Sequence, residues 1–320
     1  MIERKLFGDD MFGDAIQQKN RGVVEDRFLF PPFSVFNTRD GKWADRKHAW
    51  ISLGIQSELG RNDGNKEWLM GQRKWMGNKG VELTNISIFD PVLTELSYRW
   101  FCPLGGQVVD PFAGGSVRGI VAGCLGFKYW GCDLASQQIE ANREQLEKIK
   151  PDISPIWVNG DSMDELDNAP EADFVFSCPP YGDLEKYSDD PCDLSAMEYH
   201  AFVANYKLII LRACRKLKQN RFACFVVGNF RDKRTGSFRT LVNDTIAAFQ
   251  EQGLTLYNDI ILVTSIGTTS LRVTKQFNHS RKIGKTHQNV LVFVKGDAKE
   301  ATRVINLSRE GEGVFTPPQV

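Results

Sequence analysis

Residues 108–116, Val-Val-Asp-Pro-Phe-Ala-Gly-Gly-Ser, indicate the fold more clearly than any other stretch of the chain. The valines end a predicted strand, 107–109, and a predicted helix, 116–125, follows the glycines. Glycines let the backbone pass close to a ligand, and the first N–H groups of a helix are available to bind one. Such a turn also occurs as a plain tight connection, so the surrounding pattern has to decide between these interpretations.

Strands and helices alternate on both sides of this turn, which predicts an α/β fold with a mainly parallel, doubly wound sheet. The last two predicted strands have no predicted helix between them, so we expect them to pair antiparallel. The predicted helices are 91–101, 116–125, 136–149, 199–217 and 238–252. The predicted strands are 107–109, 129–132, 156–158, 173–176, 222–228, 257–264 and 290–294.

Composition excludes several classes of protein. The 320 residues are 42% hydrophobic and 25% charged, which is enough for a large core. The sequence contains no run of about 18 apolar residues, so no membrane-spanning helix is predicted. The N-terminus lacks a secretory pattern, so we expect a cytoplasmic protein. The seven scattered cysteines contain no C-x-x-C pair, which argues against a disulfide framework and a metal site.

Charge is unevenly distributed although the net charge is +0. Residues 133–198 contain 17 acidic and 4 basic side chains, whereas residues 205–297 contain 16 basic and 5 acidic ones. This asymmetry fits either a surface that faces a polyanion or two halves that neutralise each other in the fold.

Acidic residues follow two further strands at informative distances. Asp133 ends the next strand, about 20 residues after the glycine-rich turn, where a carboxylate can accept both hydroxyls of a ribose. Asp161, followed by Ser162, ends the strand after that, where it either receives an adenine amino group or caps a helix.

A second turn carries the sequence Ser177-Cys178-Pro179-Pro180-Tyr181 after the strand at 173–176. Two prolines remove two N–H donors and stiffen the turn. Rigid carbonyls beside an aromatic ring suit a planar base that carries an amino group, although the segment also fits a plain loop.

Together these segments resemble the S-adenosylmethionine-dependent amino-methyltransferases of DNA, over roughly residues 85–297. Asp110 to Gly114 is similar to the cofactor turn of that family, and 178–181 is similar to its catalytic turn. The segment 89–91 resembles the upstream cofactor segment, and 285–295 resembles the last strand. The sequence from Cys178 to Pro191 also resembles that of modification enzymes of phages and prophages.

The resemblance implies a Rossmann-like methyltransferase with S-adenosylmethionine as cofactor and no metal. It implies that the Asp110 carboxylate faces the methionine amino group, Asp133 the ribose and Asp161 the adenine, while Tyr181 stacks on an extruded base. The cofactor-binding residues that it implies are Asp90, Pro91, Asp110, Phe112, Ala113, Gly114, Gly115, Ser116, Asp133, Leu134, Asp161 and Ser162. The catalytic candidates are Ser177, Cys178, Pro179, Pro180 and Tyr181.

The chain departs from the family at two places. The usual Ser-Gly is Gly115-Ser116 here. Cys178 stands where the family has Asp, Asn or Ser, and a thiol accepts hydrogen bonds weakly. Three interpretations follow: carbonyls of the turn hold the amine while Cys178 fills the space of a serine, Ser177 acts in a shifted register, or Cys178 is a thiolate nucleophile for C5 methylation of a pyrimidine. An inactive site is a fourth.

Basic residues between the last two strands suggest nucleic-acid contact by a long loop at 270–285. The candidates are Arg272, Lys275, Arg281, Lys282 and Lys285. We expect the acidic segment 183–193 to close over the site instead of binding phosphate. Residues 1–84 are interpreted as an N-terminal arm and small lobe, in which the tryptophan-rich zone serves either target recognition or packing.

These observations predict a methyltransferase domain at 85–300, followed by a tail at 301–320. The expected reaction is methylation of an exocyclic base amine in DNA, with N4 of cytosine slightly favoured over N6 of adenine. Rival interpretations are amine methylation of RNA or protein, and a DNA-binding module that has lost activity. A restriction–modification role, with a homodimer or a partner nuclease, is the expected context.

Overall fold

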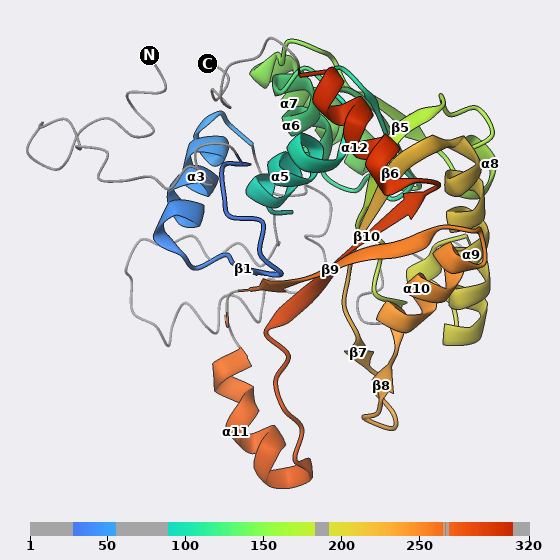
Figure 1. Ribbon diagram of the computed structural model, residues 1–320. Coiled ribbons are helices and arrows are strands. Elements are labelled where there is room, and N and C mark those ends of the chain that lie inside the picture. Colours follow the sequence, from blue (N-terminus) through green and yellow to red (C-terminus); the bar gives the residue numbers. More distant parts are fainter. Residues whose placement is uncertain (1–27, 56–88, 183–191, 265, 267–268, 310–320) are drawn as a thin grey trace, which may run out of the picture.

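The computed structural model describes residues 28–55, 89–182, 192–264, 266 and 269–309 (Figure 1). The predictions for most of the N-terminal zone, for the acidic segment 183–191 and for 310–320 therefore lie outside the described residues. Within the described part, no helix is both long and apolar enough to cross a membrane.

One eight-stranded sheet runs through the molecule in the order β1-β9-β10-β6-β5-β2-β3-β4. Neighbouring strands pair in parallel except β10, which is antiparallel to both β6 and β9. This order and the single reversed strand confirm the predicted α/β fold, a mainly parallel, Rossmann-like sheet with an antiparallel last strand. The strands are β1 (Val35–Asn37), β2 (Gln107–Asp110), β3 (Lys128–Asp133), β4 (Ile156–Asn159), β5 (Ala172–Ser177), β6 (Leu217–Val227), β9 (Thr255–Val263) and β10 (His287–Lys295).

Helices cover both faces of the sheet (Figure 1). One face carries α3 (Gly41–Ser52), α5 (Pro91–Phe101), α6 (Val117–Cys124), α7 (Ser136–Ile149) and α12 (Ala298–Leu307). The other carries α8 (Ser162–Glu165), α9 (Tyr199–Lys216) and α10 (Leu241–Gln250), with a short 3₁₀ turn, η2, at Leu194–Ala196. Two apolar clusters result, one on each side of the central strands, because those strands are buried on both faces.

The segment between the last two strands differs from its prediction. It forms a helix, α11 (Thr269–Ser280), instead of a continuous loop, although β9 and β10 pair antiparallel as expected. Only three of its twelve residues, Leu271, Val273 and Phe277, are apolar, too few to indicate a helix packed on a core. Leu271 and Phe277 keep 55% and 42% of their surface exposed. A small antiparallel hairpin, β7 (Phe230–Arg231) with β8 (Phe238–Arg239), was also not predicted.

The described part of the N-terminal zone joins the main domain. Strand β1 extends the sheet beside β9, and Trp43 and Trp50 of α3 are buried. Trp50 donates a hydrogen bond to Glu95 of α5, which also binds the Arg46 guanidinium with two contacts of 2.6 Å. These two tryptophans therefore serve packing. At the other end, Ala301 and Ile305 of α12 are buried, so the folded domain extends past residue 300.

Candidate active site

The carboxyl ends of β2, β3, β5 and β6 lie at one edge of the sheet because these strands are parallel. Both predicted motifs follow strands that end there, and β2 and β5 are direct neighbours. In such sheets, ligands bind outside the carboxyl ends of the strands. The fold therefore brings residues about 70 positions apart in sequence into one site.

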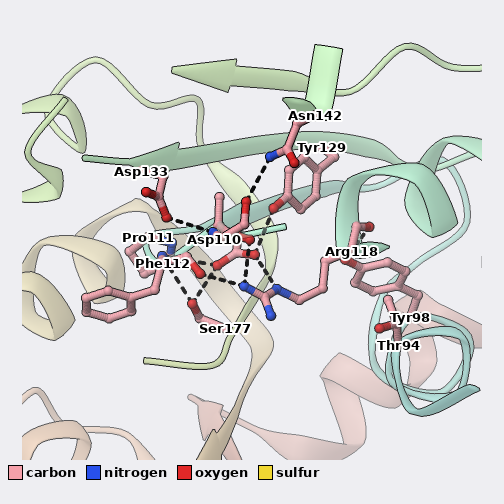
Figure 2. A network of polar contacts seen from close by, with 12 residues as sticks. Thr94, Tyr98, Asp110, Pro111, Phe112, Arg118, Tyr129, Asp133, Asn142 and Ser177 are labelled. Atoms are coloured by element: carbon pink, nitrogen blue, oxygen red, sulfur yellow. Dashed lines mark hydrogen bonds and ion pairs between the residues drawn. The ribbon is translucent and has the colours of Figure 1, made fainter. Parts of the chain in front are cut away.

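Asp110, at the end of β2, is fully buried at the centre of a polar network (Figure 2). Its carboxylate accepts hydrogen bonds from the Ser177 hydroxyl at 2.5 Å, the Tyr129 hydroxyl at 2.8 Å and the Phe112 N–H at 3.1 Å. Arg118 adds an ion pair at 2.6 Å. Four donors occupy the acceptor capacity of a carboxylate. The carboxylate is thus turned into the protein and leaves no acceptor site for an ammonium group, which gives Asp110 a positioning role.

Arg118 is a site residue that the sequence analysis missed. Its guanidinium donates to the carbonyls of Phe112 and Ala113 at 2.5 and 2.9 Å, and it lies 4.5 Å from the ring centroid of Phe89. Burial acts to lower the pKa of Arg118, but the charge of Asp110 outweighs it and raises that pKa, so the guanidinium stays charged. The available signal was an arginine alone in an otherwise apolar helix.

Asp133, at the end of β3, fixes the backbone of the glycine-rich turn through hydrogen bonds. One carboxylate oxygen accepts the N–H of Gly114 at 2.8 Å and the other accepts the N–H of Ala135 at 2.9 Å. Gly114 has a φ of 51°, a conformation that favours glycine, and its carbonyl accepts a hydrogen bond from Asn142 of α7 (Figure 2). Burial raises the pKa of Asp133, although its two N–H partners act in the opposite direction.

The remaining predicted cofactor residues divide into two groups. Asp161 caps α8 through the Met163 N–H at 2.8 Å, and the Ser162 hydroxyl donates to the Pro111 carbonyl at 2.5 Å, so both lie beside the first turn. Ser116 instead turns its hydroxyl to Gln145 of α7, away from the edge. Gly115 is buried in the turn, and Leu134 is half-buried beyond β3.

The upstream segment reaches the same edge. Asp90 caps α5 by accepting the N–H groups of Val92 and Leu93, and it also pairs with Lys47 of α3 at 3.2 Å. Pro91 is the first residue of α5. The Phe89 ring lies 5.8 Å from that of Phe176 at the end of β5, so this segment borders the second turn.

The second turn divides between core and edge. The Ser177 hydroxyl is buried and bound to Asp110, so Ser177 belongs to the network under the site. The Cys178 side chain is half-buried, and Pro179 is buried while Pro180 is half-buried. Tyr181 is half-buried, and its hydroxyl accepts a hydrogen bond from Gln288 of β10. All seven cysteines, Cys178 included, lack a disulfide bond.

Gly228, directly after β6, lies beside the second turn, a position that the sequence did not reveal. A methyl group built on Gly228 would lie 3.4 Å from Nζ of Lys285 and 3.9 Å from the hydroxyl oxygen of Tyr181. Burial lowers the pKa of Lys285, which is half-buried. Lys285, predicted to contact phosphate, therefore lies beside the second turn, together with Gln288 and Tyr181.

The other predicted nucleic-acid residues lie on and after α11, which projects from the carboxyl edge (Figure 1). The side chains of Arg272, Lys275 and Arg281 are exposed. Lys282 is half-buried, because its Nζ approaches the Gly236 turn between β7 and β8.

Comparisons with known proteins find structural likeness only. No family model matches the chain, and no curated protein matches it. TrmN of Thermus thermophilus is 15% identical, with a TM-score of 0.43, over 65% of this chain and 49% of its own. The chain thus spans about half the length of that protein.

Two further structures show a similar degree of likeness. A methyltransferase of Pyrococcus furiosus is 16% identical, with a TM-score of 0.43, over 72% of this chain and 95% of its own. The magnesium protoporphyrin IX methyltransferase ChlM of Synechocystis PCC 6803, solved with bound SAM, is 11% identical, with a TM-score of 0.43, over 74% and 95%. With TM-scores below 0.5, the strand order remains the basis of the fold assignment.

Proposed function

We propose that this chain transfers a methyl group from S-adenosylmethionine to an exocyclic amine of a DNA base, N4 of cytosine or N6 of adenine. The observation that carries the proposal is the bond from the Ser177 hydroxyl to Asp110. It joins the end of β5 to the end of β2, so the turn that resembles a cofactor site and the turn that resembles a catalytic site form one unit.

The residues of the first turn suit this cofactor. Asp133 uses one N–H donor on each oxygen, and a carboxylate has about four acceptor sites, so it retains capacity for two ribose hydroxyls. We expect Asp161, after β4, to receive the adenine amino group with the carboxylate oxygen that does not cap α8. Asp110 and Arg118 contribute by fixing the turn. When bound, the cofactor supplies an electrophilic methyl group.

The residues of the second turn suit a planar amine. Tyr181 offers a ring at the edge, and the hydrogen bond from Gln288 limits rotation of its hydroxyl. An acceptor on the turn would bind one N–H of the amine and leave the nitrogen lone pair directed outward. With the Ser177 hydroxyl buried, the acceptor has to come from Cys178 or from the carbonyls of the turn.

The cytosine C5 alternative is favoured by one observation. Arg118 lies near enough to Cys178 to interact with it electrostatically, and a neighbouring cation is what a reactive thiolate needs. That guanidinium is already bound by Asp110 and by two carbonyls, however, which weakens its effect on the thiol.

Mass spectrometry of nucleosides tests the proposal. DNA and RNA from cells that express the protein would be digested, with Tyr181→Ala as the matched variant. We expect N4-methylcytosine or N6-methyladenine in DNA from wild-type cells and a large loss with the variant. 5-Methylcytosine would favour the C5 route, a methylated RNA base would move the substrate to RNA, and the absence of any new base would contradict the proposed activity.

A further inference from the structure

The hairpin of residues 230–239 carries its positive charge outward. Its one carboxylate, Asp232, is used within the hairpin, where it accepts the N–H groups of Arg234 and Thr235 and pairs with Arg239. The Thr235 N–H, ahead of the Arg239 charge, lowers the pKa of Asp232 to about 2, so the carboxylate stays ionised and bound to these partners. The side chains of Lys233 and Arg234 are exposed at the turn.

The arm of residues 269–285 is also cationic, and the described side chains of its helix are mostly exposed. It contains five Lys or Arg residues and no Asp or Glu. Among residues 270–280 of α11, Val273 is half-buried and the others are exposed. Helices of about 12 residues are marginal in water without tertiary packing. An exposed, cationic helix of this length is therefore stabilised best by an anionic partner.

The hairpin and the arm touch each other. Gly236, at a φ of 74°, forms the hairpin turn, and a Cβ built there would lie 2.5 Å from Nζ of Lys282. Both segments project from the carboxyl edge of the sheet (Figure 1). Bringing two cationic segments together costs electrostatic free energy, which a bound polyanion would reduce.

We propose that the hairpin and the arm form one cationic clamp that binds the phosphate backbone of duplex DNA beside the target base. The choice of DNA rests on the proposed function, whereas the clamp rests on the charges and contacts above. An α-helix and a two-stranded ribbon are the two elements that the major groove of DNA admits. The sequence alone gives no reason to place the hairpin beside the arm; their contact in the structure adds the hairpin to the predicted nucleic-acid surface.

Fluorescence anisotropy with a labelled 20-base-pair duplex tests the clamp, with affinity measured over a range of salt concentrations. The variant Lys233→Glu/Arg234→Glu reverses two charges on the hairpin. The control Lys148→Glu/Lys299→Glu makes the same change in net charge on exposed residues of α7 and α12, at the opposite edge of the sheet. Loss of two phosphate contacts should reduce the slope of log affinity against log salt by about 2. We expect affinity to fall at least about 10-fold in the hairpin variant, and much less in the control.

Three outcomes would overturn the clamp. The hairpin variant could bind like the control, the wild-type protein could show no salt-dependent binding, or an RNA duplex of equal length could bind at least about 10-fold tighter than DNA. Thermal unfolding of each variant shows whether it is folded. Failure of the proposed function is a separate result, because it would leave DNA without a methylated base even if the hairpin variant lost affinity.

Discussion

Replacing Asp133 with alanine separates two roles of one carboxylate, one seen in the structure and one proposed. The carboxylate holds the N–H of Gly114 at 2.8 Å and is proposed to accept the ribose hydroxyls of the cofactor. The first contact exists with and without cofactor, so its loss appears in the stability of the protein. The second exists only in the complex, so its loss appears in the affinity.

The two magnitudes follow from the contacts. A hydrogen bond to a charged group contributes about 1.5–3 kcal/mol, so Asp133→Ala should weaken S-adenosylmethionine binding about 10- to 150-fold. A partly buried N–H left without an acceptor costs about 1–3 kcal/mol, which should appear as a lower free energy of unfolding. Asp133→Asn keeps one acceptor oxygen and should show smaller losses of both quantities.

Isothermal titration with S-adenosylmethionine measures the affinity, and urea unfolding measures the stability. The control is Asp152→Ala, which removes an exposed carboxylate between α7 and β4 and should change neither quantity. Unchanged cofactor affinity in a folded Asp133→Ala protein would refute the placement of the ribose at the end of β3. Lost affinity without lost stability would show that Gly114 does not depend on this carboxylate.

Three further predictions concern the substrate side and the N-terminal junction. Cys178→Ser should retain methyl transfer, because a hydroxyl accepts hydrogen bonds better than a thiol. The C5 route would be established instead if the folded variant were inactive and the wild-type protein formed a covalent complex with 5-fluorocytosine DNA. Gly228→Ala should keep the melting temperature and the cofactor affinity, because its Cβ makes only ordinary contacts. Its kcat/KM should fall at least about 10-fold, because the added methyl group lies beside Lys285 and Tyr181 at the proposed substrate site; unchanged kcat/KM would place Gly228 outside that site. Burial acts to raise the pKa of Glu95, but Arg46 and Arg99 lower it from 4.5 to about 2. The stabilisation from this lowered pKa is complete above pH 4.5, and the free energy of unfolding in urea should fall by about 3 kcal/mol as the pH falls toward 2. Glu95→Gln should be less stable, and its free energy of unfolding should change less over that pH range.

The sequence by itself determined the class of fold and the order of the motifs along the chain. Strand and helix periods are local properties, so the alternation over 107–294 predicted the sheet and its reversed last strand. The turn residues of both motifs were also readable, because glycine and proline restrict the backbone at the positions where they stand. The separation of Asp110 and Asp133 by one helix and one strand placed both at the same edge.

Only the tertiary structure decided what these side chains contact. Asp110 was expected to face the cofactor, yet four donors from the turn after β2 and from α6, β3 and β5 surround its carboxylate, and no local pattern reports such a convergence. Arg118 and Gly228 were likewise identified as site residues only by their contacts with other elements. The helix α11 was missed because too few of its residues are apolar to set a helical period. The proposed clamp needs the contact of Lys282 with Gly236, across some 45 residues of chain. Sequence periodicity reports which face of an element is buried; contacts between elements depend on how the sheet brings their ends together.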